Sequence, residues 1–141
     1  MKVTTDTNVL VSGTFWKGDS DDIINIIDSG KIELILSEEL IGEYNDVINR
    51  DEIIEKIEKK NLILNESVQK IIKDSTIVNP ANSLDIIKED PSDNIILECA
   101  IEGNVDYIIT QDNHLLKIKE FKGIKIVTPS EFLKMVGKSK N

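Results

Sequence analysis

The chain has 141 residues, of which 40% are apolar and 30% charged, and these values are typical of one soluble globular domain. Its net charge of −9 argues against a general nucleic-acid coat protein, because such proteins normally present a basic surface. The acidic balance does not exclude a nuclease, since carboxylates gathered at a metal site would be offset by bound cations. It also leaves room for a basic protein partner.

The sequence contains no candidate for a membrane span, which requires about 20 consecutive apolar residues. The opening segment MKVTTDTNVLVSG resembles a signal peptide for only a few residues, because Asp6 interrupts it. The single cysteine, Cys99, cannot form an internal disulfide, which agrees with a reducing compartment. We therefore expect a cytoplasmic protein.

In chain order, the first half of the sequence predicts a strand at Lys2–Thr5, a helix opening within Asp6–Gly13, a helix over Ser20–Ser29 that stops at Gly30, a buried strand at Ile32–Leu36, an amphipathic helix over Ser37–Arg50 with Ser37 as its N-cap, and helices over Asp51–Lys60 and Asn65–Asp74. The second half predicts a strand at Thr76–Val78, a helix over Pro91–Glu102, a strand at Tyr107–Thr110, a short helix at Asp112–Leu116, a strand at Lys125–Val127 and a closing helix over Ser130–Val136.

Strands that alternate with helices indicate an α/β fold with a largely parallel sheet. The most linker-like region is 79–91, but it is too short to establish a domain boundary. We expect a single domain over residues 1–136, followed by a frayed tail at 137–141.

Two acidic residues follow predicted strands. Asp6 comes directly after the first strand, and Asp112 follows the strand YIIT by two residues. In a doubly wound sheet, ligands bind beyond the carboxyl ends of the strands, so both carboxylates are candidate ligand-binding groups. Each also suits the N-cap of the helix that follows it, and the sequence leaves both interpretations open.

Asp93 lies in the first turn of its predicted helix, on the same face as three apolar residues, Ile96, Leu97 and Ala100. A carboxylate directed inward is costly unless it is paired, hydrogen-bonded or bound to a metal. The alternative is a capping-box variant in which Asp90 caps the helix and Asp93 reaches back. Glu43 lies at the margin of the apolar stripe of Ser37–Arg50, where an ordinary solvated side chain is the alternative.

Other chemistries receive little support from the sequence. There is no GxxxxGK[ST] or GxGxxG motif for nucleotide binding. One histidine and one cysteine argue against a His/Cys zinc site or a Cys–His nucleophile pair. We interpret His114 as a surface residue first and a substrate contact second, and Cys99 as a small core residue. Trp16 suits a core position or, less simply, a platform for base stacking.

The chain resembles PIN-domain nucleases in segments that follow the order of that family: DTNVLVSG from Asp6, SEELIGEY from Ser37, DPSDNIILECAIEGNVDYIITQD from Asp90, and HLL from His114. The likeness is greatest to the PIN proteins described as toxin components of toxin–antitoxin pairs. The resemblance implies a three-layer α/β/α sandwich with a mainly parallel central sheet.

The resemblance also implies the site and its chemistry. The catalytic and metal-binding carboxylates of the family correspond here to Asp6, Glu43, Asp93 and Asp112, and the supporting positions to Asn8 and Thr110. The implied cofactor is Mg²⁺ or Mn²⁺, the implied reaction is hydrolysis of RNA, and the implied partners are an antitoxin protein and a second copy in a homodimer. By sequence proximity alone, the candidate RNA contacts are Lys17, Arg50, Lys117 and Lys119.

Two alternatives to a ribonuclease stay open. The first is a PIN-like module that binds RNA or protein without cutting it. The second is a phospho-receiver domain, which is also a small acidic α/β fold. A receiver needs an acceptor aspartate after its third strand and a lysine after a late strand, whereas Ile32–Leu36 leads here into Ser37-Glu38 and Val127 leads into Thr128-Pro129. The receiver interpretation therefore ranks last.

Overall fold

The structure is a computed structural model that describes residues 1–15, 18–50, 55, 70, 73–80 and 92–137. Its elements in chain order are β1 (Lys2–Thr5), α1 (Thr7–Phe15), α2 (Asp19–Asp28), β2 (Glu33–Ser37), α3 (Glu38–Ile48), β3 (Thr76–Val78), α6 (Ser92–Glu102), β4 (Tyr107–Ile109), α7 (Asn113–Leu116), β5 (Glu120–Phe121), β6 (Ile124–Val127) and α8 (Pro129–Met135).

The strands form one sheet in the order β3-β2-β1-β4-β6-β5. All neighbours are parallel except β5 and β6, which pair antiparallel. The central pair is β1 and β4, in which Thr5 is aligned with Ile109. This register brings the residues that follow β1 and β4 to the same edge of the sheet.

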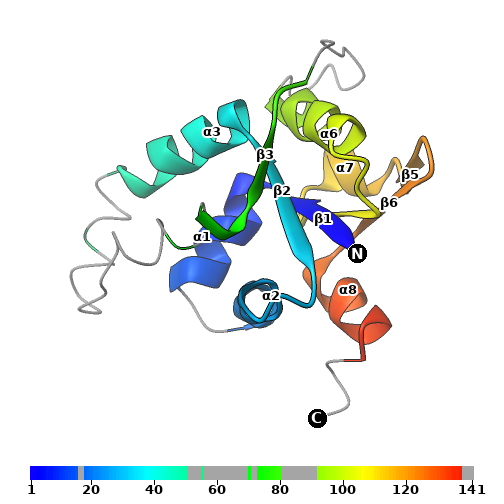
Figure 1. The fold of residues 1–141 in the computed structure, drawn as a ribbon, viewed down its shortest axis with the longest axis horizontal. Coiled ribbons are helices and arrows are strands. Elements are labelled where there is room, and N and C mark those ends of the chain that lie inside the picture. The colour runs from blue at the N-terminus through cyan, green and yellow to red at the C-terminus, as the bar shows by residue number, and fades with distance from the viewer. Residues whose placement is uncertain (16–17, 51–54, 56–69, 71–72, 81–91, 138–141) are drawn as a thin grey trace.

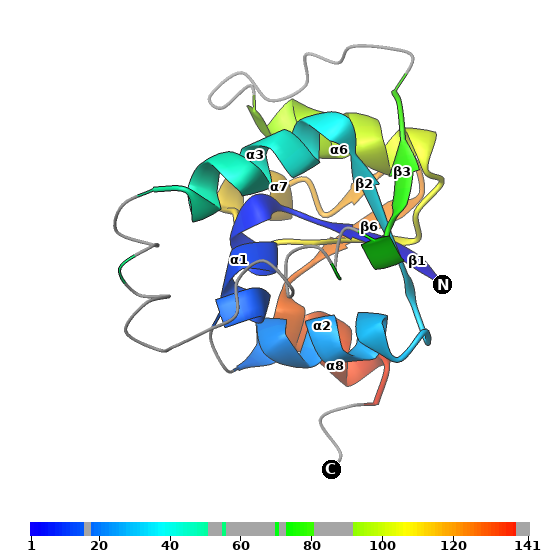
Figure 2. The same cartoon turned by 60° about the vertical axis from the view of Figure 1, so that its left-hand side comes forward.

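Helices cover both faces of the sheet (Figures 1 and 2). Figure 2 shows α3 and α6 above the sheet and α2 and α8 below it, while α1 and α7 lie on the side away from the N-terminus. One contact between layers joins Thr4 of β1 and Cys99 of α6, whose Oγ1 and Sγ atoms are 3.8 Å apart. The prediction of a three-layer α/β/α fold with a mainly parallel sheet is therefore confirmed.

The strands supply much of the core because they are buried on both faces, as expected of a parallel sheet between helices. Leu34, Ile35 and Leu36 of β2 are all nearly inaccessible to solvent, as are Ile108 and Ile109 of β4. Within the described residues, no helix is long and apolar enough to cross a membrane.

Local signals in the sequence place several helix ends correctly. The Ser37 hydroxyl caps α3 by accepting the Leu40 N–H at 3.2 Å, and Gly30 adopts the left-handed φ of 83° shortly after α2 ends. The short antiparallel strand β5 was not predicted, because its few residues carry no recognisable alternation. The predicted helices 51–60 and 65–74 fall mostly outside the described residues, as do Trp16 and 138–141 of the predicted tail.

A buried glycine controls how closely α6 approaches β2. Gly103 directly follows α6, and its N–H donates to the Cys99 carbonyl at 2.9 Å. A Cβ atom added at Gly103 would lie 2.5 Å from Cγ2 of Ile35, well inside van der Waals contact. Because Ile35 is itself only 1% exposed, its side chain has little room to move away.

We predict that Gly103→Ala lowers the free energy of unfolding by about 1–3 kcal/mol, the usual effect of overpacking a core. Gly42→Ala is the matched control, because Gly42 lies within helix α3 and a Cβ there meets nothing within 4 Å. The control should raise stability by about 0.5–1 kcal/mol through helix propensity. Urea denaturation of both variants measures these changes. If Gly103→Ala were as stable as Gly42→Ala, the close approach of Gly103 to Ile35 would not limit the size of the side chain at position 103.

Candidate metal centre

Asp6 joins the end of β1 to the start of α1. Its Oδ1 accepts the Val9 N–H at 2.9 Å, so the carboxylate satisfies an open donor in the first turn of the helix. Its Oδ2 accepts a hydrogen bond from the Thr110 hydroxyl, which comes from the segment directly after β4. The capping role that the sequence left open for Asp6 is therefore present, and a second strand end holds the same side chain.

Thr110 links two of the predicted acidic residues. Its side chain is completely buried. While its hydroxyl donates to Asp6, the same oxygen accepts the backbone N–H of Asp112 at 3.0 Å. A hydroxyl can donate one hydrogen bond and accept others, so Thr110 fixes the positions of both carboxylate-bearing segments at once.

Asp112 caps α7. Its Oδ1 accepts the His114 N–H at 2.8 Å, and the backbone at Asp112 is extended, as N-cap residues usually are. Its other carboxylate oxygen is not needed for this cap, so capping leaves Asp112 able to take part in ligand binding.

Asp93 reaches the same region from the first turn of α6. The residue is 8% exposed, beside Ile96 and Leu97 in the core, which agrees with the inward direction inferred from the helical periodicity. Within the described part of the chain, one ligand atom each from Asp93, Asp112 and His114 lie within 4.8 Å of one another. The proposed capping partner of Asp93, Asp90, lies outside the described residues.

The electrostatics of the site are unfavourable to negative charge. The pKa of Asp6 is raised above its usual value of 3.8, mainly by burial, with the nearby charge of Asp112 adding to the effect. The hydrogen bonds from Thr110 and the Val9 N–H act in the opposite direction and only partly offset the burial. Converging, partly buried carboxylates raise one another's pKa unless a cation is present.

Glu43 lies on α3, a helix that packs against both α1 and α6. The side chain is partly buried, and its Oε1 atom is shielded from solvent, so Glu43 is not the fully solvated residue of the alternative interpretation. It is not among the residues whose ligand atoms lie within 4.8 Å of one another. Asn8, one of the predicted supporting residues, is exposed on α1.

The remaining predicted residues lie mostly at the surface. Arg50, Lys117 and Lys119 are exposed, and Lys17 lies outside the described residues.

Cys99 is buried, as expected of a core residue, and burial raises the pKa of its thiol to about 11, so it does not supply a thiolate nucleophile near neutral pH.

His114 is the residue whose position the sequence indicated least well. We predicted a surface or substrate-contacting side chain, and the imidazole is indeed partly exposed. Its Nδ1, however, lies 3.6 Å from Oδ1 of Asp112 and 3.9 Å from Oδ2 of Asp93. The available signal was the spacing of His114 two residues after an N-cap aspartate, which places its ring next to the cap.

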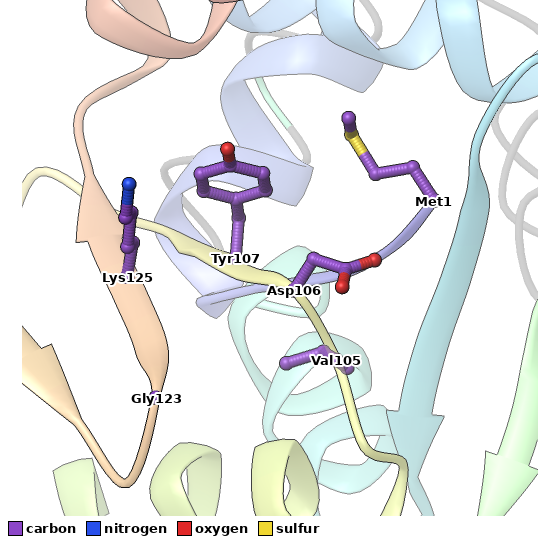
Figure 3. Close-up of a pocket in the computed structure, with 6 residues that line it drawn as sticks. All are labelled: Met1, Val105, Asp106, Tyr107, Gly123 and Lys125. Atoms are coloured by element: carbon purple, nitrogen blue, oxygen red, sulfur yellow. The ribbon is translucent and has the colours of Figure 1, made fainter.

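An open cavity of about 410 Å³ lies at the opposite edge of the sheet (Figure 3). Met1, Asp106, Tyr107 and Lys125 line it near the amino ends of β1, β4 and β6. It therefore shares no lining residue with the carboxylates that follow β1 and β4, and the two features are separate.

The carboxylates are chemically suited to a divalent cation. Asp93 and Asp112 bring carboxylate oxygens together from separate segments, and Mg²⁺ prefers such hard ligands. Asp6 is not in that group of ligand atoms, but it is tied to the Asp112 backbone through Thr110. Burial raises the pKa of Asp6, and the charge of Asp112 adds to the shift; a bound cation would offset both effects. We therefore regard this edge of the sheet as a candidate metal centre.

Comparisons with known proteins agree with this architecture. The model of the family described as "PIN domain" matches residues 2–114. Among solved structures, the chain is similar to one from the crystal structure of VapBC2 from Rickettsia felis bound to a DNA fragment from their promoter, with a TM-score of 0.60 and 13% identity. That alignment covers 91% of this chain and 98% of the other. No curated protein matches the sequence.

The family match spans β1 through the start of α7 and therefore contains each of the four predicted acidic positions. The solved structure, at its low identity, supports the fold alone. On the extent of the family match, the chain belongs to the PIN domain family.

Proposed function

We propose that this protein is a metal-dependent endoribonuclease whose metal site is formed by Asp6, Glu43, Asp93 and Asp112. The observation that carries the proposal is the meeting of Asp93, from the core-facing side of α6, with Asp112 at the end of β4. Asp6 is tied to the same segment through Thr110. Glu43 is the least supported member, since its place rests mainly on the family resemblance.

The residues have distinct roles in this proposal. Asp93 and Asp112 hold Mg²⁺ or Mn²⁺, Asp6 adds a further carboxylate, and Glu43 completes the set directly or through water. A bound divalent cation supplies charge neutralisation for the phosphodiester and lowers the pKa of an attacking water. Thr110 keeps Asp6 and Asp112 in place, and Asn8 supports the carboxylates or the attacking water. The candidate RNA contacts, chosen by sequence proximity alone, are Lys17, Arg50, Lys117 and Lys119.

We further propose that the protein is a cytoplasmic toxin controlled by an antitoxin, and that it forms a homodimer. The resemblance to toxin components and the fold similarity to a VapBC2 chain support this assignment. The net charge of −9 is suited to an antitoxin with a basic segment. Residues 1–136 act as a single domain in this proposal, with 137–141 as a tail.

The alternative function is a PIN-like module that binds RNA or protein without cleavage. The acidic net charge favours it to the extent that tight RNA binding requires a basic surface. The presence of all four acidic positions favours catalysis. The two functions differ in whether the carboxylates are needed for activity, and substitution of Asp93 tests that directly.

Asp93→Asn should reduce metal-dependent cleavage of RNA by at least on the order of 100-fold, comparable with the loss of one group that stabilises transition-state charge. The control is Glu102→Gln, which removes one negative charge from the exposed end of the same helix. Both variants are assayed on an RNA panel with Mg²⁺, Mn²⁺ or EDTA after their folding is matched by circular dichroism. Full activity of Asp93→Asn, or cleavage that persists in EDTA, would contradict the proposed mechanism.

Thr110→Val removes the bridging hydroxyl at nearly constant volume, and it leaves the Asp6 oxygen without its buried donor. We expect the free energy of unfolding to fall by about 1–3 kcal/mol and metal affinity to weaken. Thr110→Ser retains the hydroxyl and should restore both properties. Denaturation and calorimetric metal titration of the pair measure this, and identical behaviour of Val and Ser would argue against the bridge.

Asp6→Asn should affect the stability of the metal-free protein in a pH-dependent way. Because the folded-state pKa of Asp6 is raised above 3.8, its contribution to stability is fully present below that unfolded value and is lost as pH rises through the folded value. Asparagine does not ionise, so in EDTA the variant should gain stability relative to wild type as pH rises through this range. Denaturation between about pH 4 and pH 8 tests this. If Asp6→Asn instead lost stability relative to wild type as pH rises, the sign of the shift would be contradicted.

A further inference from the structure

The sequence contains one histidine, and the fold places it beside two of the proposed metal ligands. His114 Nδ1 lies 3.6 Å from Oδ1 of Asp112 and 3.9 Å from Oδ2 of Asp93. Both distances exceed the usual length of a direct hydrogen bond, about 2.7–3.2 Å. The imidazole nitrogen therefore lies near both carboxylates without a direct hydrogen bond to either oxygen.

These separations agree with shared coordination of one ion. Two atoms that each bind a cation at about 2.1 Å can be at most about 4.2 Å apart. The distances from Nδ1 of His114 to both carboxylates fall inside this limit. All three donor atoms lie within 4.8 Å of one another, close to the spacing that a single cation requires.

The position of the imidazole is built into α7. The His114 N–H donates to the Asp112 carboxylate, and the next residue, Leu115, is completely buried and anchors the short helix in the core. The His114 side chain is 42% exposed, whereas that of Asp93 is 11% exposed. An ion arriving from solvent can therefore meet the imidazole before the buried carboxylate.

We propose that Nδ1 of His114 is a ligand of the metal held by Asp93 and Asp112, and that this nitrogen shifts the site away from Mg²⁺ toward first-row transition ions. This inference rests on the proposed function, because it assumes that the carboxylates bind metal. Mg²⁺ prefers oxygen ligands, whereas imidazole suits ions such as Fe²⁺ and Ni²⁺. A site of two carboxylates and one imidazole therefore prefers ions such as Ni²⁺ over Mg²⁺ more strongly than a site of carboxylates alone does.

The thermodynamic test compares wild type with His114→Asn in tag-free protein, using Mg²⁺, Mn²⁺, Co²⁺ and Ni²⁺ in calorimetric titrations. Co²⁺ and Ni²⁺ affinity should fall by at least about 10-fold, Mn²⁺ affinity by less, and Mg²⁺ affinity should be unchanged. Asn113→Ala is the control, since Asn113 is exposed in the same turn and its loss leaves the donors intact. An equal effect of His114→Asn on Mg²⁺ and Co²⁺ overturns the proposal.

A spectroscopic test does not depend on affinity or activity. Because His114 is the sole histidine in the sequence, protein grown on histidine labelled with ¹⁵N in the ring carries one labelled imidazole. Pulsed electron paramagnetic resonance of bound Mn²⁺ should show a ¹⁵N coupling, and His114→Asn should lack it. Bound Mn²⁺ without that coupling overturns the assignment of His114 as a ligand.

The two proposals fail in different ways. If wild type binds no divalent metal and cleaves no RNA, both the proposed function and the histidine ligand are wrong. If wild type binds Mg²⁺ and cleaves RNA but His114→Asn retains the full series of metal affinities, only the histidine ligand is wrong.

Discussion

The parallel pairing of β1 with β4 is the constraint on which the candidate site depends. The two strands are neighbours at the centre of the sheet, with Thr5 aligned with Ile109, so the residues that follow them emerge together. The Thr110 hydroxyl then connects Asp6 to the backbone of Asp112. The hydrogen bonding between β1 and β4 thereby determines how two carboxylates are spaced, although the strand residues themselves take no part in the proposed chemistry.

Two helices, α6 and α7, add the remaining groups at this end of the sheet. α6 directs Asp93 inward next to Ile96 and Leu97, and α7 begins at Asp112 and carries His114. Holding a carboxylate in a buried site near another costs stability, as the pKa of Asp6 indicates, since burial first and the charge of Asp112 second raise it. Such a cost at a site of converging acidic groups is typical of positions retained for binding or catalysis.

Much of this arrangement follows from the sequence alone, for identifiable reasons. Apolar runs and their periodicity predict the central strands and most helices, and the spacing of Asp93 from Ile96 predicts its inward direction. The short strand β5 and the meeting of His114 with Asp93 were not predicted. β5 pairs locally with β6 but is too short to show an alternation. The meeting of His114 with Asp93 joins α7 to α6, and a local pattern does not encode such a contact. Glu43 shows the same limit. Its position at the margin of the apolar stripe predicts which face of α3 it lies on, but not which residues it meets.

The central claim is that these carboxylates bind a divalent metal. The most direct measurement is anomalous diffraction from crystals of the wild-type protein soaked in Mn²⁺. We predict an anomalous peak between Asp93 and Asp112, within about 2.0–2.3 Å of at least one oxygen from each. Ordered crystals in saturating Mn²⁺ with no peak at this edge of the sheet, or with a peak only elsewhere on the protein, would contradict the account.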